Sequence, residues 1–335
     1  MKVLVTGGAG YIGSTVCSAL LDGGHTPIIV DSLITGRAEF ARGRIFYKAD
    51  ISDAAALGEV FDKHPDITCT IHCAALIVVP ESMERPYDYY RENVAKSLQL
   101  FWSLREHGCR RVVFSSSAAV YDVVPEYMVT EQSPLRPQSP YARTKYMMEM
   151  ILRDMCNAYQ MRGIALRYFN PIGADPDLRT GIHMEHPSHV LGKLVDTALG
   201  KEPVFRITGT DWPTRDGTGI RDYIHVWDLA LAHVKAVEQF DAAFERCPEQ
   251  DLPYLVINLG TGRGVTVREL VAAFESVYGT ELAKQECPPR PGDVAGSYAN
   301  ADTARELLGW QALRPIEEGI SSALQWAEKR RSILH

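Results

Sequence analysis

A tyrosine and a lysine four residues apart, Tyr141 and Lys145 in the segment YARTK, could carry acid–base chemistry. On a helix, positions i and i+4 share a face, so the phenol and the ammonium can point into one crevice. A free tyrosine has a pKa of about 10 and is a poor base at neutral pH, but a nearby ammonium favours the phenolate. In isolation such a pair is usually a solvated helix face, so its chemistry depends on what surrounds it.

Three consecutive serines, Ser115 to Ser117, follow an apolar run at 111–114. If that run is a strand of a parallel sheet, hydroxyls at its carboxyl end face the crevice where ligands bind. Polar residues can also do no more than close a strand. The order of strand, serine cluster and tyrosine–lysine helix nevertheless favours a functional site.

A second motif, TGGAGYIG at 6–13, places Gly7, Gly10 and Gly13 at G-x-x-G-x-x-G spacing. Gly7 would allow a tight turn, Gly10 a close approach of the backbone to a pyrophosphate, and Gly13 close packing of helix on strand. The following helix would direct its N-terminus at the negative charge. This pattern predicts a dinucleotide site.

An acidic residue, Asp31, lies about 20 residues beyond the glycines, at the end of the second apolar run. A carboxylate there accepts hydrogen bonds from the ribose hydroxyls of NAD and repels a 2′-phosphate, so NAD is favoured over NADP. Asp50 and Ile51, which lie between the apolar runs at 27–30 and 70–73, are candidate adenine contacts.

The elements that must position these residues alternate along the first half of the chain. Strands are expected at 3–5, 27–30, 70–73, 111–114 and 164–167, and helices near 12–23, 53–64, 86–107 and 141–161. Apolar strands alternating with helices predict a parallel sheet covered on both faces. The fold class is therefore α/β, a doubly wound parallel sheet of the Rossmann type, over residues 1–170.

The second half, residues 171–335, has a looser pattern that predicts a smaller α/β substrate-binding part. Helices are expected near 189–199, 227–239, 266–278, 301–309 and 315–331, with strands near 204–208 and 254–259. We expect the two parts to share some strands and helices and to form a ligand crevice between them.

Composition excludes several functional classes. A net charge of −7 argues against a nucleic-acid surface. No apolar run reaches the ~18 residues of a membrane span, and the first residues lack the regions of a signal peptide, so the cytoplasm is the expected compartment. Seven scattered cysteines without a Cys-x-x-Cys pair indicate reduced thiols. Cys69, His72 and Cys73 lie in an apolar run, and no metal site is expected.

Several long segments, in this order, resemble the extended short-chain dehydrogenase/reductase family and, within it, the UDP-hexose 4-epimerases. The matching segments are TGGAGYIG at 6–13, HCAAL at 72–76, SSSAAVY at 115–121, YARTK at 141–145, YFNPIGA at 168–174, DGTGIRDYIHVWDLA at 216–230, NLGTGRGVTVREL at 258–270 and RPGD at 290–293. They cover nearly the whole chain and are more specific for the family than for one sugar.

The resemblance implies that the sugar is first oxidised and then reduced at carbon 4, so the overall reaction shows no net redox change. Tyr141 takes the proton of the 4-hydroxyl of a UDP-linked sugar, while hydride passes from carbon 4 to NAD. Ser117 holds the same oxygen, and Lys145 lowers the pKa of the tyrosine and binds the nicotinamide ribose. The 4-keto sugar then turns over and hydride returns to its other face.

The resemblance also implies two sets of binding residues. The cofactor set is Gly7, Gly10, Tyr11, Ile12, Gly13, Asp31, Asp50, Ile51, Ala74, Ala75, Asn93, Ser115, Tyr141, Lys145 and Tyr168. The substrate set is Ser117, Tyr141, Asn170, His189, Val190, Arg206, Arg221, Tyr223, Arg290 and Asp293, with Arg179 and Lys193 as further candidates. In the substrate set, Arg221 and Arg290 would clamp the diphosphate, because a guanidinium can bind phosphate oxygens bidentately.

Departures from the family pattern leave the sugar open. Ile77 stands where some relatives carry lysine, Asp122 where glycine is usual, and Gly192 and Lys193 replace more familiar residues after His189. Ser297 aligns with a position where a bulky tyrosine restricts some relatives to unsubstituted hexoses, so an N-acetyl group has room. Arg179 and Lys193 could equally meet a carboxylate at carbon 6, which keeps UDP-glucuronate among the alternatives to a UDP-glucose or UDP-galactose type.

Other activities fit less well. Related 4,6-dehydratases need acid–base residues after the serine, where this chain has Ala118 and Ala119. A decarboxylase is disfavoured by the RDYIHV and YFNP segments. An NAD-binding regulator without turnover would be expected to lose Ser117, Tyr141 or Lys145. The resemblance also implies a homodimer that forms through the helices at 86–107 and 141–161.

Overall fold

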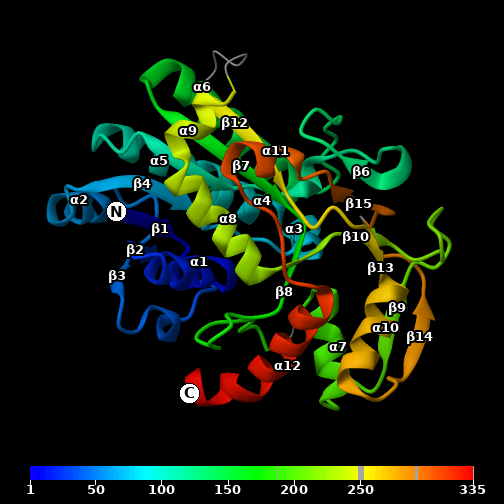
Figure 1. Cartoon of the computed structure of the whole chain (residues 1–335). Helices are drawn as coiled ribbons and strands as arrows, with labels where there is room; N and C mark the ends of the chain where they lie inside the picture. The colour runs from blue at the N-terminus through cyan, green and yellow to red at the C-terminus, as the bar shows by residue number, and fades with distance from the viewer. Residues whose placement is uncertain (186, 248–252, 291–292, 335) are drawn as a thin grey trace.

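The computed structural model describes residues 1–185, 187–247, 253–290 and 293–334. Its central feature is a seven-stranded parallel sheet in the order β12-β7-β5-β4-β1-β2-β3 (Figure 1). The strands are β1 Lys2–Thr6, β2 Thr26–Asp31, β3 Ile45–Lys48, β4 Ile67–His72, β5 Arg111–Ser115, β7 Arg162–Tyr168 and β12 Tyr254–Leu259. The predicted doubly wound, Rossmann-type class is confirmed.

Helices cover both faces of this sheet, which is why its strands are apolar runs. One face packs against α1 Tyr11–Asp22, α8 Val226–Glu238, α9 Phe240–Glu245 and α11 Asp302–Leu308. The other packs against α2 Ala54–Lys63, α5 Lys96–Glu106 and α6 Pro140–Tyr159. Two short helices, α3 Val79–Glu84 and α4 Pro86–Tyr89, and a π-helical turn, Tyr90–Ala95, precede α5.

The second part of the chain packs on the carboxyl-terminal side of this sheet, at the lower right of Figure 1. Of the helices after residue 171, α7 Val190–Ala198, α10 Val267–Tyr278 and α12 Ile316–Ile333 lie there, while α8, α9 and α11 cover the large sheet. Short strands complete the second part: β6 Met128–Val129, β8 Asn170–Ile172, β9 Phe205–Thr208, β10 Ile220–Arg221, β11 Tyr223–His225, β13 Val265–Thr266, β14 Lys284–Cys287 and β15 Gly296–Ala299. Leu191, Leu194, Phe274 and Ile320 belong to its separate core.

The two parts are interlocked. Strand β12 comes from the second half of the chain, yet it pairs with β7 at the edge of the large sheet. In return, β6 from the first half pairs with β15. A boundary at residue 170 therefore separates the two parts in the sequence only. In the folded chain, β12 and β6 each belong to a sheet of the other part.

Helix α6 shows how local sequence sets the site. Ser139 caps its N-terminus by accepting a hydrogen bond from the Ala142 amide at 3.2 Å, and Pro140 occupies the first turn. The helix ends at Gln160, whose φ is +55°. These signals fix the start of the helix one residue before Tyr141.

Candidate active site

One large pocket, of about 760 Å³, opens at the carboxyl ends of β1, β2, β4, β5 and β7, where parallel sheets bind ligands. Its other wall comes from the second part of the chain, including β10, β11 and the start of α7. The crevice expected between the two parts is thus present.

The glycine turn after β1 forms the floor of this pocket. Gly7 has φ +71°, and a Cβ atom there would lie 2.6 Å from the amide nitrogen of Ala74. A Cβ at Gly13 would lie 2.2 Å from the carbonyl oxygen of Gly7. Both positions need glycine, so that α1 can begin close to the strands with its N-terminus toward the pocket.

Asp31 ends β2 at the pocket wall, as the motif predicts. Its carboxylate accepts hydrogen bonds from the amides of Ala9 at 3.0 Å and Leu33 at 2.8 Å. The side chain is therefore held in place, and it still faces the pocket.

Asp50 and Ile51 also line the pocket, but Asp50 has a partner that the sequence did not suggest. The Lys96 ammonium lies 2.5 Å from its carboxylate and 2.6 Å from that of Glu92. Burial opposes ionisation of Asp50, but the bonds from Lys96 and Ser52 lower its pKa. Lys96 is thus a charged residue of the cofactor side that sequence reasoning missed.

Ser117, Tyr141 and Lys145 lie together on the wall of the pocket. Ser117 follows β5 and caps a short 3₁₀ turn by accepting from the Ala119 amide at 3.2 Å. Tyr141 and Lys145 stand one turn apart at the start of α6. Burial raises the pKa of the Tyr141 phenol, and Ser117 opposes that rise by hydrogen bonding to it.

The Lys145 ammonium is buried and donates a hydrogen bond to the Ser115 carbonyl at 2.9 Å. It also lies 5.1 Å from the centre of the Phe114 ring. Burial lowers its pKa to about 8, while Cys73 and Glu149 act in the opposite direction. The lysine can therefore lose or keep its proton close to neutral pH.

Two residues of the predicted cofactor set, Ser115 and Asn93, lie behind the pocket wall. The Ser115 hydroxyl bonds the Nε2 atom of His233 at 2.8 Å. Asn93 accepts from the Leu76 amide at 2.8 Å and donates to Thr144 Oγ1 at 3.0 Å. Both are fully enclosed, so they support the residues in front of them.

The remaining predicted cofactor residues lie on the pocket wall. They are Gly10, Tyr11, Ile12, Ala74, Ala75 and Tyr168. Tyr11 is anchored by a hydrogen bond from its hydroxyl to the Gly173 carbonyl at 2.7 Å.

The opposite end of the pocket carries positive charge. Arg221 donates to the carbonyls of Ile220, Ala295 and Val294 at 2.7–3.0 Å. Burial lowers its pKa, and within the described residues it has no carboxylate ion pair. Arg290 lies on the same wall and pairs with Asp293 at 3.1 Å; Pro291 and Gly292 of the RPGD segment lie outside the described residues.

Two buried polar atoms on this side, Tyr223 Oη and His189 Nε2, have no hydrogen-bond partner among the described residues. His189 caps α7 through its other ring nitrogen, which accepts from the Gly192 amide at 3.1 Å. Asn170 and Val190 also line the pocket. Unpaired buried polar atoms beside a half-buried guanidinium suit a polar, anionic ligand.

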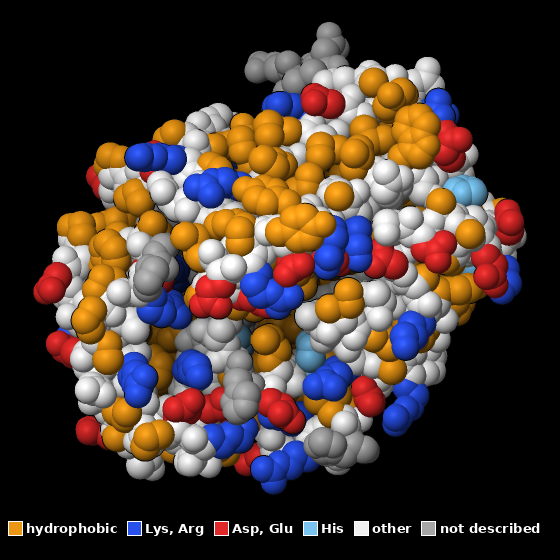
Figure 2. Space-filling view, turned by 180° about the vertical axis from the view of Figure 1, so that it is seen from behind, with side chains coloured by type: hydrophobic (Ala, Val, Ile, Leu, Met, Phe, Trp, Pro, Cys, Tyr) orange, Lys and Arg blue, Asp and Glu red, His pale blue; other side chains and the backbone are white. Residues whose placement is uncertain are grey.

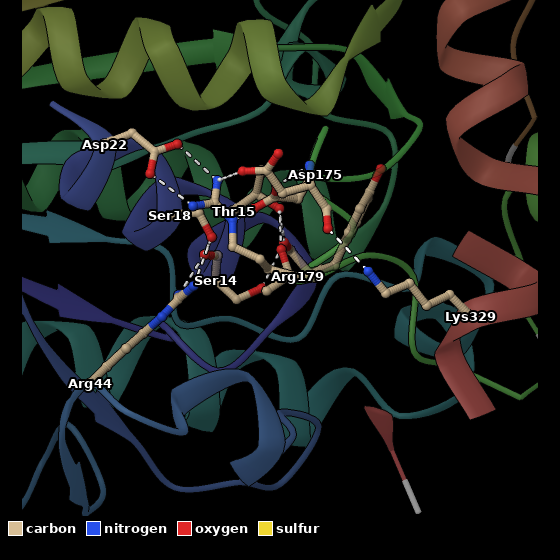
Figure 3. Close-up of polar contacts among 11 residues, drawn as sticks. Ser14, Thr15, Ser18, Asp22, Arg44, Asp175, Arg179 and Lys329 are labelled. Atoms are coloured by element: carbon tan, nitrogen blue, oxygen red, sulfur yellow. Dashed lines mark hydrogen bonds and ion pairs between the residues drawn. The ribbon is translucent and has the colours of Figure 1, made fainter. Parts of the chain in front are cut away.

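Three predicted substrate residues are not brought to the pocket wall. Arg179 binds Asp22 at 2.8 Å and Asp175 at 2.8 Å, and so ties a loop to the end of α1 (Figure 3). Lys193 lies 3.4 Å from Glu202, and Arg206 is an exposed residue of β9. Their charges are turned toward local carboxylates or solvent, so the structure gives no support for sugar contacts.

Sequence reasoning also missed parts of the wall that lack a chemical signature. Ser32, Ile34, Thr35, Ile182, His183 and Met184 line the side near Asp31. His183 Nε2 bonds the Thr35 carbonyl at 2.7 Å and so joins the two parts across the pocket. The segment 76–80, which runs into α3, lines the catalytic side with Tyr121, Asp122 and Val123; of these, only Ile77 and Asp122 are singled out by the sequence. Such residues meet only in the folded chain.

The fold and site together define a class of nucleotide-dependent enzymes, and comparison with known proteins names the family. The model of the NAD dependent epimerase/dehydratase family matches residues 3–251. The chain belongs to this family, which confirms the predicted resemblance.

Among its relatives is the UDP-glucose 4-epimerase of Bacillus subtilis (strain 168), 40% identical over 97% of this chain and 96% of the relative. The structure is similar to UDP-glucose-4-epimerase from Stenotrophomonas maltophila with bound NAD and formylated UDP-arabinopyranose, with a TM-score of 0.92, 36% identity and 99% of each chain covered. It is also similar to the Bifidobacterium longum enzyme in complex with NAD+ and UDP, with a TM-score of 0.90, 34% identity and 99% of each chain covered.

Proposed function

We propose that this protein binds NAD and interconverts the 4-epimers of a UDP-hexose of the glucose/galactose type. The observation that carries the proposal is the convergence of three features on one pocket. Ser117, Tyr141 and Lys145 lie between the glycine turn on one side and the Arg221 end on the other. The relatives named above support the same reaction.

The residues present fit NAD. Gly7 and Gly13 let α1 begin tightly against the strands, and the α1 N-terminus lies on the pocket wall, where it suits a pyrophosphate. The Asp31 carboxylate faces the pocket, where it would accept hydrogen bonds from the hydroxyls of a ribose. When bound, NAD supplies the hydride acceptor and donor for carbon 4 of the sugar.

Side chains of the pocket transfer the proton of the 4-hydroxyl. The Tyr141 phenolate takes the proton of the 4-hydroxyl and later returns it, and the Ser117 hydroxyl holds the same oxygen. The Lys145 ammonium favours the phenolate through its charge. Since the same groups serve both directions, the reaction needs no additional acid or base.

The Arg221 end suits the diphosphate. Arg221 is a half-buried cation without a carboxylate partner among the described residues, and Arg290 lies on the same wall. Tyr223 and His189 offer polar atoms that have no partner in the described structure. A UDP group held there would leave the sugar between the arginines and Tyr141.

A neutral sugar fits better than a uronate. Within the described residues, the lysines and arginines that line the pocket are Lys96, Lys145, Arg221 and Arg290. Lys96 is neutralised by Asp50 and Glu92, Lys145 serves Tyr141, and the arginines lie at the diphosphate end. Asp122 and Glu81 also line the pocket, so a carboxylate at carbon 6 would meet negative charge.

Ser297 lines the pocket and is small, which supports UDP-N-acetylglucosamine as a second substrate class. Elimination of water is disfavoured, because Ala118 and Ala119 follow Ser117 and cannot transfer protons. A regulator without turnover would not need the three catalytic side chains on the pocket wall.

We also propose a homodimer in the cytoplasm. Leu98 and Trp102 of α5 and Tyr159 of α6 are 37–44% exposed. Hydrophobic side chains gather over the upper part of the molecule in the view from behind, where these helices lie (Figure 2).

All seven cysteines are free thiols, which supports a reducing compartment. No helix of the described residues is long and apolar enough to cross a membrane.

The proposal is tested by incubating the purified protein separately with UDP-glucose, UDP-N-acetylglucosamine and UDP-glucuronate, without added NAD. We expect conversion of UDP-glucose to its 4-epimer, resolved by chromatography and proton NMR. Conversion of UDP-glucuronate alone would refute the neutral-sugar proposal. If no sugar is converted even after NAD is added, the epimerase proposal fails for these substrates.

A further inference from the structure

A buried ion pair lies directly behind the catalytic residues and takes no part in the chemistry described above. Glu149 of α6 and Arg167 of β7 are each only 4% exposed at the side chain. They meet in a two-point contact, with Arg167 Nε donating at 2.9 Å and Nη2 at 2.6 Å. Burying two charges costs several kcal/mol of solvation that their attraction often fails to recover, so such a pair is weak evidence for a stabilising role.

The pair holds both ends of the segment that carries Ser117. At one end the Ser116 hydroxyl donates to Glu149 Oε1. At the other end Arg167 Nη1 donates to the Tyr121 hydroxyl at 3.1 Å, and the guanidinium lies 4.9 Å from the centre of that ring. Ser117 lies between these two tethers and Tyr121 lines the pocket.

The same pair is fixed to the helix that carries the other two catalytic residues. Glu149 follows Lys145 by four residues and Tyr141 by eight, so the three lie along one face of α6. The position of Ser117 relative to Tyr141 therefore depends on a contact between Glu149 and the serine segment.

The charge of Glu149 also acts on Lys145. Burial lowers the pKa of Lys145 to about 8, and Glu149 and Cys73 are the groups that raise it. His72 of β4 is a further titratable side chain close enough to Lys145 for their charges to interact. Burial lowers the pKa of His72 to about 3, so this imidazole is neutral.

Around Glu149 the titratable groups are Arg167 and Tyr254, apart from Lys145. Burial, and then Glu149, raise the pKa of the Tyr254 phenol well above its usual value, so that side chain stays neutral. Arg167 is the only one of these groups that pairs with the carboxylate within the described residues.

We propose that Glu149 and Arg167 are positioning residues of the catalytic site: the pair locks the 116–121 segment onto α6, so that Ser117 and Tyr141 meet the same oxygen, and its carboxylate balances the charge of Lys145. This inference rests on the proposed epimerase function. It assigns a role to two residues that touch neither sugar nor cofactor.

Glu149→Gln tests the charge, because the amide keeps the shape of the side chain. We expect kcat to fall about tenfold, with KM changed less than about threefold. The alkaline limb of the kcat profile should move to lower pH by about one unit, since loss of a nearby negative charge makes Lys145 release its proton more readily. Ser116→Ala tests the tether, and should lower kcat while leaving the alkaline limb in place.

Asp175→Asn is the matched control, because Asp175 is also a buried carboxylate paired with an arginine, away from the pocket (Figure 3). It should lower the melting temperature without moving the pH profile. A Glu149→Gln enzyme with the kcat and alkaline limb of the wild type would overturn the proposal. If Glu149→Gln does not fold, Ser116→Ala decides, and wild-type kcat in that variant is the contrary result.

A measurement independent of turnover separates this inference from the proposed function. Lysine side chains labelled with ¹⁵N can be titrated by NMR in the protein as purified, with Lys145 assigned from a Lys145→Arg spectrum. We expect a lower pKa for Lys145 in Glu149→Gln than in the wild type, whether or not a sugar is converted. Equal values would remove the charge role, whereas an inactive wild type would refute the epimerase proposal alone.

Discussion

At the scale of single residues, the side chains whose type and spacing indicate a particular chemistry were the easiest to predict from this sequence. Tyr141, Lys145, Ser117 and Asp31 were predicted from residue type and spacing, and the structure places all four on one pocket wall. Each such residue carries a chemistry that its neighbours cannot supply. The places of Lys96 and His183 in the pocket were not predicted, because a single lysine or histidine indicates no function until its partners in the fold are known.

Charged residues are harder to assign to a site from the sequence, because their ion-pair partners depend on the fold. Arg179 is a candidate for contact with a carboxylate on the substrate, but it pairs with Asp22 at the end of α1 and with Asp175. Asp175 lies only four residues before Arg179, but Asp22 lies 157 residues away, and nothing in the local sequence relates Asp22 to Arg179. An arginine can be assigned to a ligand only when the carboxylates that pair with it inside the protein are known.

The first prediction concerns the phenol. Tyr141→Phe should lower kcat by about a thousandfold or more, because no other side chain can take the proton of the 4-hydroxyl. Bound NAD per protein, measured by absorbance after denaturation, should remain at the wild-type level. Tyr146→Phe, on the same helix but not on the pocket wall, is the control and should behave as wild type. Comparable turnover in Tyr141→Phe would remove the phenol from the mechanism.

The second prediction concerns the diphosphate. Arg221→Met should raise KM for the UDP-sugar by about ten- to a hundredfold, because a charge-assisted contact to phosphate is lost. Steady-state kinetics measure this directly. Arg206→Met removes an exposed arginine that lies outside the pocket, and should leave KM unchanged. The reverse ranking of the two variants would place the UDP group elsewhere.

At the scale of elements, the alternation of strands and helices was predictable, while pairing partners were not. The apolar runs at 27–30 and 111–114 fall inside β2 and β5. The expected helix at 86–107 is instead α4, a π-helical turn at 90–95 and α5. The turn places the buried Asn93 against Leu76 and Thr144, which are long-range contacts that no helical period encodes.

The third prediction concerns the packing of α1 on the glycine turn. Gly13→Ala would place a Cβ 2.2 Å from the Gly7 carbonyl oxygen, so the helix must move away from the turn. We expect loss of bound NAD and a fall of about 2 kcal/mol in the free energy of unfolding. Gly58→Ala in α2 has its nearest atom at 3.7 Å and is the control. It should keep NAD and gain stability, because alanine favours helix. Full NAD content in Gly13→Ala would show that the turn tolerates a side chain.

At the scale of the molecule, the class and the crevice were predictable, but the way the halves interlock was not. The sequence indicates a strand near 254–259, yet only the structure shows that it extends the first sheet beside β7. Parallel partners far apart in sequence leave no local signal. The identity of the sugar was likewise not predictable from the sequence, because the pocket wall combines the segment 76–80, Val123 and Ser297, which are far apart in the chain.

The fourth prediction concerns assembly. Trp102 on α5 is 44% exposed, packs at 5.7 Å against Tyr159 and carries the Arg105 guanidinium at 5.0 Å. Trp102→Glu would bury a charge in the proposed interface and should yield monomers by sedimentation velocity, where the wild type sediments as a dimer. Leu313→Glu, at an exposed site after α11, should remain dimeric. A monomeric wild type would rule out the proposed interface.

The central claim is that the hydrogen on carbon 4 leaves the sugar and returns to it while the 4-hydroxyl proton passes through Tyr141. The most direct measurement is proton NMR of UDP-galactose incubated with the purified protein in D₂O, without added NAD. The account predicts that UDP-glucose appears with its carbon-4 hydrogen retained, because hydride does not exchange with water. Deuterium at carbon 4 of the product, or no conversion of this substrate, would contradict the account.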